Sequence, residues 1–238
     1  MFEDIGEIVK KEMVLFLLID HSGSMDGSKI GAVNTAIREV LPELKDVVGS
    51  DTAIKIAALL FSTGCHWMYP EPVFSDQFQW NTVEADGLTT MGEAFKELAS
   101  KMSKNSYLKS PSASVAPAIF LMSDGCPTDE YKDGLETLRN NRWFKYAIKV
   151  AVAIGDDADL DVLEEFTGTK EAVILTHTPE ALKKMIRFVT ITSSKIGSQS
   201  QGLVNGQTKS KQDTLINDIN DYLKDNPDID QTASDDWD

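Results

Sequence analysis

The chain has 238 residues, of which 42% are apolar and 26% are charged, so it can bury a core in one large domain or in a domain with an appendage. Its 38 acidic and 23 basic residues give a formal net charge of −15 at pH 7. This excess of acid argues against nucleic acid and against an anionic membrane as the main partner, because both are negatively charged. It suits a cation, or a partner protein with a basic face.

The N-terminal segment MFEDIGEIVKKEM carries acidic residues where a signal peptide is basic, and no small-residue cleavage site follows it. The longest apolar stretch, residues 13–19, is far too short to span a bilayer. Cys65 and Cys126 stand in different contexts, and two reduced thiols are favoured over one disulfide. We therefore expect a cytoplasmic protein without membrane contact.

Along the chain, five apolar runs predict strands buried on both faces, because apolar and polar residues do not alternate in them. They cover residues 14–19, 54–61, 118–122, 148–154 and 172–175. Between them, apolar residues recur at three- and four-residue steps, as on one side of a helix. The helical sets are Ile30, Val33, Ile37, Val40, Leu41 and Leu44; Met91, Phe95, Leu98 and Met102; Leu135 and Leu138; Leu160, Leu163 and Phe166; and Leu182, Met185, Ile186 and Val189.

This alternation predicts an α/β fold: a doubly wound, Rossmann-like, mostly parallel sheet with helices on both faces. Residues 65–80 interrupt the rhythm with aromatic and β-branched residues, and they predict a short antiparallel hairpin or edge strand.

After residue 194 the composition becomes rich in Gly, Ser, Gln and Asn, which is typical of a flexible linker. Leu215, Ile216, Ile219, Tyr222 and Leu223 then predict one short amphipathic helix. The end, NPDIDQTASDDWD, has five aspartates and no basic residue. We expect a domain at 1–194, a linker at 195–210, and a helix with an acidic tail at 211–238.

Polar residues follow two of the predicted strands. In doubly wound sheets, ligands bind beyond the carboxyl ends of the strands, where the strand order reverses. Asp20 follows the first strand, with Ser22 and Ser24 in the next turn, and Asp124 follows the strand at 118–122. Alternate spacing lets both serine hydroxyls face one side of an extended loop. Thr89 precedes a helix in a third loop, EADGLTTMGEAF.

These five side chains offer oxygen and neither nitrogen nor sulfur, which favours Mg²⁺ or Mn²⁺ over Zn²⁺. Only two are charged, so a bound ion would attract a further carboxylate. Two alternatives stay open. Asp20, Ser22 and Ser24 can form an ordinary helix-capping turn, and Thr90 can replace Thr89 as a ligand.

The set DHSGS, a later Thr and a later SDG resembles the DxSxS…T…D metal-ion-dependent adhesion site (MIDAS) of von Willebrand factor A (VWA) domains, over residues 12–192. The phrases LLIDHSGSM, GLTTMGEA and SDGCPTD are most similar to bacterial VWA proteins of the tellurium-resistance-associated, TerY-like group. All five motif positions are filled. The second glycine of the usual GGT loop is replaced by Leu88.

The resemblance implies a non-enzymatic interaction module. In this family Ser22 and Ser24 would ligate the ion directly, Thr89 would do so in the ligand-competent state, and Asp20 and Asp124 would act largely through water. The open position would accept an Asp or Glu of a partner protein. The likeness also implies a bacterial stress or tellurite-resistance system, with a kinase or a phosphatase encoded nearby as partner.

One enzymatic alternative is a Mg²⁺-dependent phosphohydrolase of the haloacid-dehalogenase type, with Asp20 as the nucleophile. Such enzymes need a second Asp two residues later as general acid and base, and that position is Ser22. For residues 211–238, solvation, docking to another protein and donation of a carboxylate to the metal of a second copy all remain open.

Overall fold

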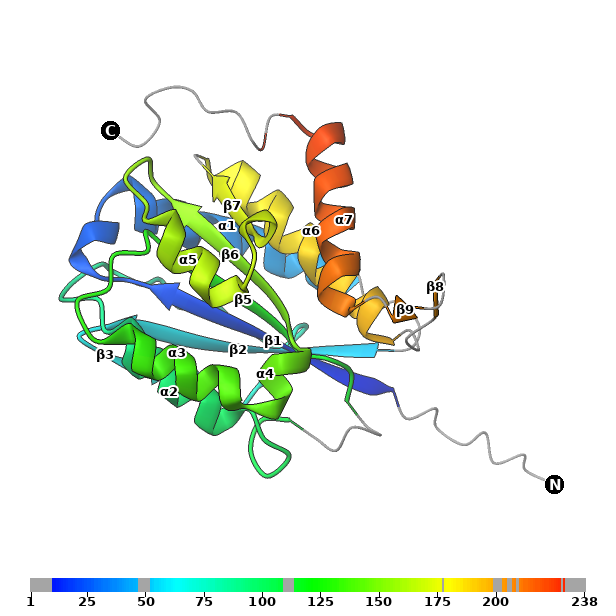
Figure 1. The fold of residues 1–238 in the computed structure, drawn as a ribbon. Helices are drawn as coiled ribbons and strands as arrows, with labels where there is room; N and C mark the ends of the chain where they lie inside the picture. Colours follow the sequence, from blue (N-terminus) through cyan, green and yellow to red (C-terminus); the bar gives the residue numbers. More distant parts are fainter. Residues whose placement is uncertain are drawn as a thin grey trace.

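The structure is a computed structural model. It describes residues 10–46, 52–108, 114–176, 178–198, 203–204, 207–208, 210–227 and 229. A seven-stranded sheet forms the centre (Figure 1), with the order β3-β2-β1-β5-β6-β7 and with β4 also paired to β2. Its strands are β1 Lys11–Asp20, β2 Thr52–Ser62, β3 Gly64–Trp67, β4 Val73–Phe74, β5 Ala118–Ser123, β6 Ile148–Ile154 and β7 Val173–Thr176. The five predicted strands are confirmed.

The sheet is parallel from β2 through β7 and antiparallel where β3 and β4 meet β2. The predicted antiparallel element in residues 65–80 is therefore confirmed, but β3 and β4 both pair with β2 rather than with each other. Pro70 and Pro72 lie between the two strands. Proline has no N–H to donate to a ladder, which accounts for the break between them.

Helices cover both faces of the sheet (Figure 1), as predicted. On one face lie α1 Ser28–Asp46, α6 Pro179–Ser198 and α7 Lys211–Asp225, whose apolar side chains join one core cluster. On the other face lie α2 Met91–Lys101, α3 Tyr131–Asn140, α4 Arg142–Tyr146 and α5 Leu160–Thr167, which join a second cluster. Two 3₁₀ turns, η1 Gly23–Met25 and η2 Lys170–Ala172, complete the body.

Strand β1 shows why these strands are apolar throughout. Leu15 and Leu17 point into the first cluster, whereas Phe16 and Leu18 point into the second. Successive side chains of a strand alternate between faces, so a sheet covered on both sides needs apolar residues at every position.

Helices α2 and α3 cross through two glycines. A Cβ added to Gly134 would overlap the backbone of Gly92, and a Cβ added to Gly92 would lie 2.8 Å from the Cα of Tyr131. The absence of side chains at both positions lets the helix backbones touch. This crossing places the start of α2 beside the loop after β5.

The predicted C-terminal helix is present as α7. Its first turn carries a capping box between Ser210 and Asp213, and Leu215 and Ile219 are buried in the first cluster. Helix α6 runs to Ser198, so the first four residues of the predicted linker are helical. Two-residue strands β8 Leu203–Val204 and β9 Gln207–Thr208 pair antiparallel.

Residues 199–202, 205–206, 209 and 230–238 lie outside the described residues. The division of the chain at residue 194 stays a prediction. In the part of the chain that the structure describes, no helix is both long and apolar enough to cross a membrane.

Candidate metal site

The strand order reverses between β1 and β5, because β1 has β2 on one side and β5 on the other. Asp20 is the last residue of β1, and Asp124 directly follows β5. The parallel register pairs Ile19 with Met122, so Asp20 is level with Ser123 and Asp124 follows one residue later at the same edge of the sheet. The predicted crevice at the carboxyl edge thus has one aspartate from each side of the reversal.

Three loops meet at this edge: the loop after β1, the loop after β5, and the loop before α2. Hydrogen bonds join them pairwise. They run from Ser123 Oγ to Asp20 Oδ2 (2.6 Å), from Gly23 N to Gly87 O (3.0 Å), and from Thr89 N to the Thr128 hydroxyl oxygen (3.0 Å). The loops that carry the five predicted residues are therefore held against one another.

The first loop turns its oxygens to one side. Asp20 is fully buried, and its Oδ1 accepts a hydrogen bond from Ser22 N (2.9 Å). The hydroxyls of Ser22 and Ser24 lie 3.2 Å apart, so the alternate spacing does place them together. Ser22 is buried and Ser24 is exposed. The side chain of Ser22 makes no capping bond to η1, which leaves the capping interpretation of this serine without support.

The electrostatics of Asp20 reflect its burial. The pKa of this carboxyl is raised from 3.8 to about 6: burial is the main cause, the nearby Asp124 charge adds a smaller increase, and hydrogen bonds from Ser123 and Ser22 offset part of the rise. Two carboxylates close together in a buried place repel each other. A cation between them would relieve that repulsion.

Asp124 has one oxygen without a hydrogen bond. Its Oδ1 accepts from Cys126 N (3.3 Å), whereas its buried Oδ2 accepts no hydrogen bond from any described residue. The nearest cation is Lys29, whose Nζ lies 3.7 Å from Oδ2, within ion-pair range but beyond hydrogen-bond distance. Lys29 instead donates to Asp157 Oδ1 at 2.6 Å. An anionic oxygen left this way is costly unless a ligand completes it.

The two neighbouring threonines differ. Thr90 Oγ1 donates to Ser62 O (2.9 Å) and accepts from Gly64 N (2.9 Å). Thr89 is only 3% exposed, and its hydroxyl makes no hydrogen bond within the described residues. The hydroxyl of Thr90 is therefore engaged in holding the loop, and Thr89 as the ligand stays a prediction.

Several residues that position the candidate ligands are not among those predicted from the sequence. Ser123 extends β5 by one residue and orients Asp20, Thr128 fixes the backbone of Thr89, and Lys29 reaches Asp124 from α1. Asp129 accepts from the backbone amides of Gly92 and Glu93 at the start of α2 (3.1 and 3.2 Å). Position 123 could have been found, because it stands directly before Asp124 at the end of an apolar run.

Any metal held at this edge would need hydroxyl ligands in addition to carboxylates. Among the described residues, no group of three His, Cys, Asp or Glu side chains is placed to hold a metal. The two carboxylates and the hydroxyls of Ser22, Ser24 and Thr89 form an oxygen-only set, which suits a hard divalent cation. The set fits such an ion, since the buried Asp124 Oδ2 accepts no hydrogen bond from any described residue. Beside it, Cys126 is an exposed thiol whose pKa is raised by burial and by Asp124, so it is a poor nucleophile.

The family model for the von Willebrand factor type A domain matches residues 15–188, well over half of the chain. The chain belongs to the VWA domain family. VWA domains are metal-binding protein-interaction modules and are generally not enzymes, and the MIDAS members bind a divalent metal. The phosphohydrolase alternative has no support from this match. Sequence comparison with curated proteins finds no relative.

Solved structures share the fold of this VWA domain. A von Willebrand factor type A protein from Catenulispora acidiphila is 20% identical (TM-score 0.57, covering 77% of this chain and 43% of that one). Proximal thread matrix protein 1 from the mussel byssus, described with a zinc-occupied MIDAS motif, is 14% identical (0.57, 76% and 48%). BatB from Bacteroides thetaiotaomicron is 12% identical (0.52, 76% and 100%). The chain spans less than half the length of the first two.

Proposed function

We propose that this VWA domain is a non-enzymatic, metal-dependent module that captures an acidic side chain of a partner protein. Asp20, Ser22, Ser24, Thr89 and Asp124 hold one Mg²⁺ or Mn²⁺ ion in this proposal. The single observation that carries it is the buried Asp124 Oδ2, which accepts no hydrogen bond from any described residue, while the hydroxyls of Ser22, Ser24 and Thr89 belong to the loops joined around it.

The chemical types of the donors suggest which residues bind the ion directly and which bind it through water. Neutral hydroxyls from Ser22, Ser24 and Thr89 would ligate the ion directly, and Asp20 and Asp124 would hold its water ligands. The bound ion supplies an electrophilic position for one more anion, because its direct protein ligands are uncharged. A carboxylate from a partner Asp or Glu would fill that position.

The likeness of LLIDHSGSM, GLTTMGEA and SDGCPTD to the TerY-like group supports a place in a bacterial tellurite- or stress-resistance system, or a related signalling system. We propose a cytoplasmic role there, with a kinase or a phosphatase of the same operon as the partner. An excess of 15 negative charges is consistent with a partner whose own surface is basic around the donated carboxylate.

Metal binding is tested by thermal unfolding with Mg²⁺, Mn²⁺, Ca²⁺ or Zn²⁺ against EDTA. A ligand that binds only the native state raises the unfolding temperature, and we expect Mg²⁺ or Mn²⁺ to do so. The Ser22→Ala/Ser24→Ala variant should lose the increase, whereas Thr90→Ala should keep it. An unchanged increase in the double serine variant would remove these hydroxyls from the site.

Partner capture is tested by pull-down of the neighbouring gene products with and without EDTA. Capture should require the metal and should be lost in Asp20→Ala, while Asp76→Ala, an exposed aspartate far along the chain, should capture normally. Equal capture by all three proteins in EDTA would count against a metal-bridged contact.

A further inference from the structure

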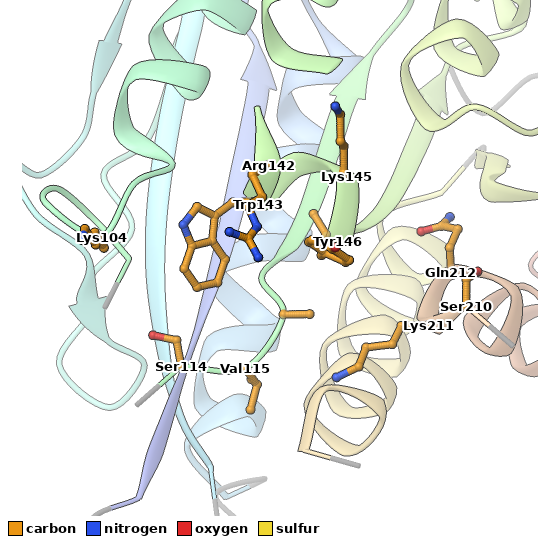
Figure 2. Close-up of a pocket in the computed structure, with 12 residues that line it drawn as sticks. Lys104, Ser114, Val115, Arg142, Trp143, Lys145, Tyr146, Ser210, Lys211 and Gln212 are labelled. Carbon is orange, nitrogen blue, oxygen red and sulfur yellow. The ribbon is translucent and has the colours of Figure 1, made fainter. Parts of the chain in front are cut away.

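A second cleft lies at the other end of the sheet from Asp20. It has a volume of about 830 Å³ and is bounded by α4, by residues 114–116 before β5 and by the first turn of α7. Figure 2 shows Trp143, Arg142 and Tyr146 of α4 above Ser114 and Val115, with Lys104 on one side and Lys211 on the other. Strands β5 and β6 begin beside it, so the cleft is at the amino ends of strands whose carboxyl ends adjoin the candidate metal site.

The cleft is basic in an otherwise acidic protein. Lys104, Arg142, Lys145 and Lys211 line it, and no described lining residue is acidic. Among the described residues, Lys104, Arg142 and Lys145 form no ion pair, and Lys211 Nζ donates only to Gly197 O (2.7 Å). With a net charge of −15 on the whole chain, four cations in a lining that includes no described acidic residue indicate an anionic ligand.

The wall of the cleft is aromatic. Trp143 is half-buried and Tyr146 is 59% exposed, and both follow Arg142 in the five-residue helix α4. Trp, Tyr and Arg are the residues most enriched where proteins bind proteins. This composition favours a protein segment that combines acidic residues with an aromatic or apolar anchor.

The backbone does not favour a phosphate ligand. Nucleotide and phosphate sites use free amides at helix N-termini, but both helices that start at this cleft are capped by their own side chains. Asn141 accepts from the amides of Trp143 and Phe144 at the start of α4. Ser210 and Asp213 exchange hydrogen bonds at the start of α7. Recognition is left to the cationic and aromatic side chains.

We propose that this cleft binds residues 230–238 of a second copy of the chain. That segment, DQTASDDWD, holds four aspartates and Trp237 and has no Lys or Arg. Its aspartates complement the cations of the cleft, and Trp237 supplies an indole for the surface made by Trp143 and Tyr146. A tail that is mostly polar has little other reason to carry a tryptophan.

The position of the tail favours a second copy over the same chain. Ile229 is 1% exposed within the first core cluster, so the tail starts from the far end of α7. This helix has 15 residues and therefore separates Ile229 from Lys211 by about 22 Å. Trp237 stands eight residues beyond Ile229 and reaches at most about 28 Å, so the tail of the same chain would have to run almost straight along α7 to bring its tryptophan into the cleft. Reciprocal exchange of two tails between two copies carries no such restriction and gives a closed two-fold dimer.

The experiment is analytical ultracentrifugation of the full chain over a range of concentrations, in EDTA. We expect a monomer–dimer equilibrium that weakens as salt increases. Deletion of residues 230–238, Lys104→Glu/Arg142→Glu and Asp235→Lys/Asp236→Lys should each raise the dimer dissociation constant by at least about tenfold. The control Lys96→Glu/Lys170→Glu makes the same charge change at exposed positions elsewhere and should leave the equilibrium unchanged.

The most discriminating experiment mixes the two charge-reversed variants. An equimolar mixture of the cleft-reversed and tail-reversed proteins should dimerise, although neither does so alone. Thermal unfolding of each variant confirms that the changed residues, which are exposed or lie in the tail, leave the domain folded.

Four results would overturn the proposal: a wild-type monomer at every concentration, a dimer that survives tail deletion, a dimer that survives cleft reversal, or no recovery in the mixture. Dissociation of the dimer by ATP or inorganic phosphate would also overturn it, because the cleft would then be a phosphate site. The inference does not depend on the proposed metal. Self-association that requires Mg²⁺ would place the tail at the metal site instead and would likewise contradict it.

Discussion

The substitution Asp20→Asn is expected to stabilise the metal-free protein at neutral pH while it abolishes metal binding. Burial raises the pKa of Asp20 from 3.8 to about 6, so the native state favours the protonated carboxyl. The stability associated with this group is fully present below pH 3.8 and is lost as the pH rises through about 6. At 1.36 kcal/mol per pKa unit, the ionised carboxylate costs about 3 kcal/mol at neutral pH.

Asparagine removes this cost but keeps only one acceptor for the two donors, Ser22 N and Ser123 Oγ. The lost hydrogen bond costs about 1 kcal/mol, which leaves a net gain of about 1–2 kcal/mol at pH about 7.5. At pH about 5 part of the cost of ionisation is already absent, and the gain should shrink by about 1 kcal/mol.

Urea unfolding in EDTA at these two pH values measures the gain. Asp76→Asn, at an exposed position, should change stability at neither pH. Equal destabilisation of Asp20→Asn at both pH values would refute the reasoning, since it would mean that no charge penalty exists at this position.

Two further predictions concern the fold and the charge beside the site. Gly134→Ala should destabilise the protein by about 2–3 kcal/mol, because its Cβ would overlap the backbone of Gly92. Gly31→Ala, in a helix with open space around it, should instead increase the free energy of unfolding by about 0.5–1 kcal/mol. Chemical denaturation of both variants measures the difference. Lys29→Met should tighten divalent-cation binding by up to about tenfold at low ionic strength, because the Lys29 ammonium lies 3.7 Å from Asp124 Oδ2 and a positive charge a few ångströms from a divalent ion opposes its binding by about 1–2 kcal/mol in water. Titration calorimetry measures this, and unchanged affinity would show that Lys29 does not act on the ion.

The fold could be predicted because strands that are buried on both faces are apolar at every position. Residues such as Leu17 and Leu18 face opposite clusters, so the sequence cannot alternate, and the helices between strands carry clear apolar stripes. Strand β4 and helix α4 were not predicted as separate elements. Each is short, and each is fixed by a partner elsewhere: β4 by its pairing with β2, and α4 by the Asn141 cap.

The sequence predicts those parts of the candidate site that depend on residue type and on spacing along the chain. Asp20, Ser22 and Ser24 are close in sequence, and Asp124 follows a strand, so parallel topology alone brings them to one edge. The contribution of Lys29 could not be predicted, because its approach to Asp124 depends on how α1 packs against the sheet.

The basic cleft gives no local signal in the sequence. Lys104, Arg142 and Lys211 are far apart along the chain, and only the packing of α4 beside the start of α7 brings them together. The acidic tail, in contrast, is visible at once as a composition change.

The central claim is tested most directly by a crystal structure grown with Mn²⁺ and measured for anomalous scattering. The account predicts one anomalous peak at the carboxyl edge of the sheet, in contact with the hydroxyls of Ser22, Ser24 and Thr89 and within one water of Asp20 and Asp124. A peak elsewhere, or none at this edge while the protein is saturated with Mn²⁺, would contradict it.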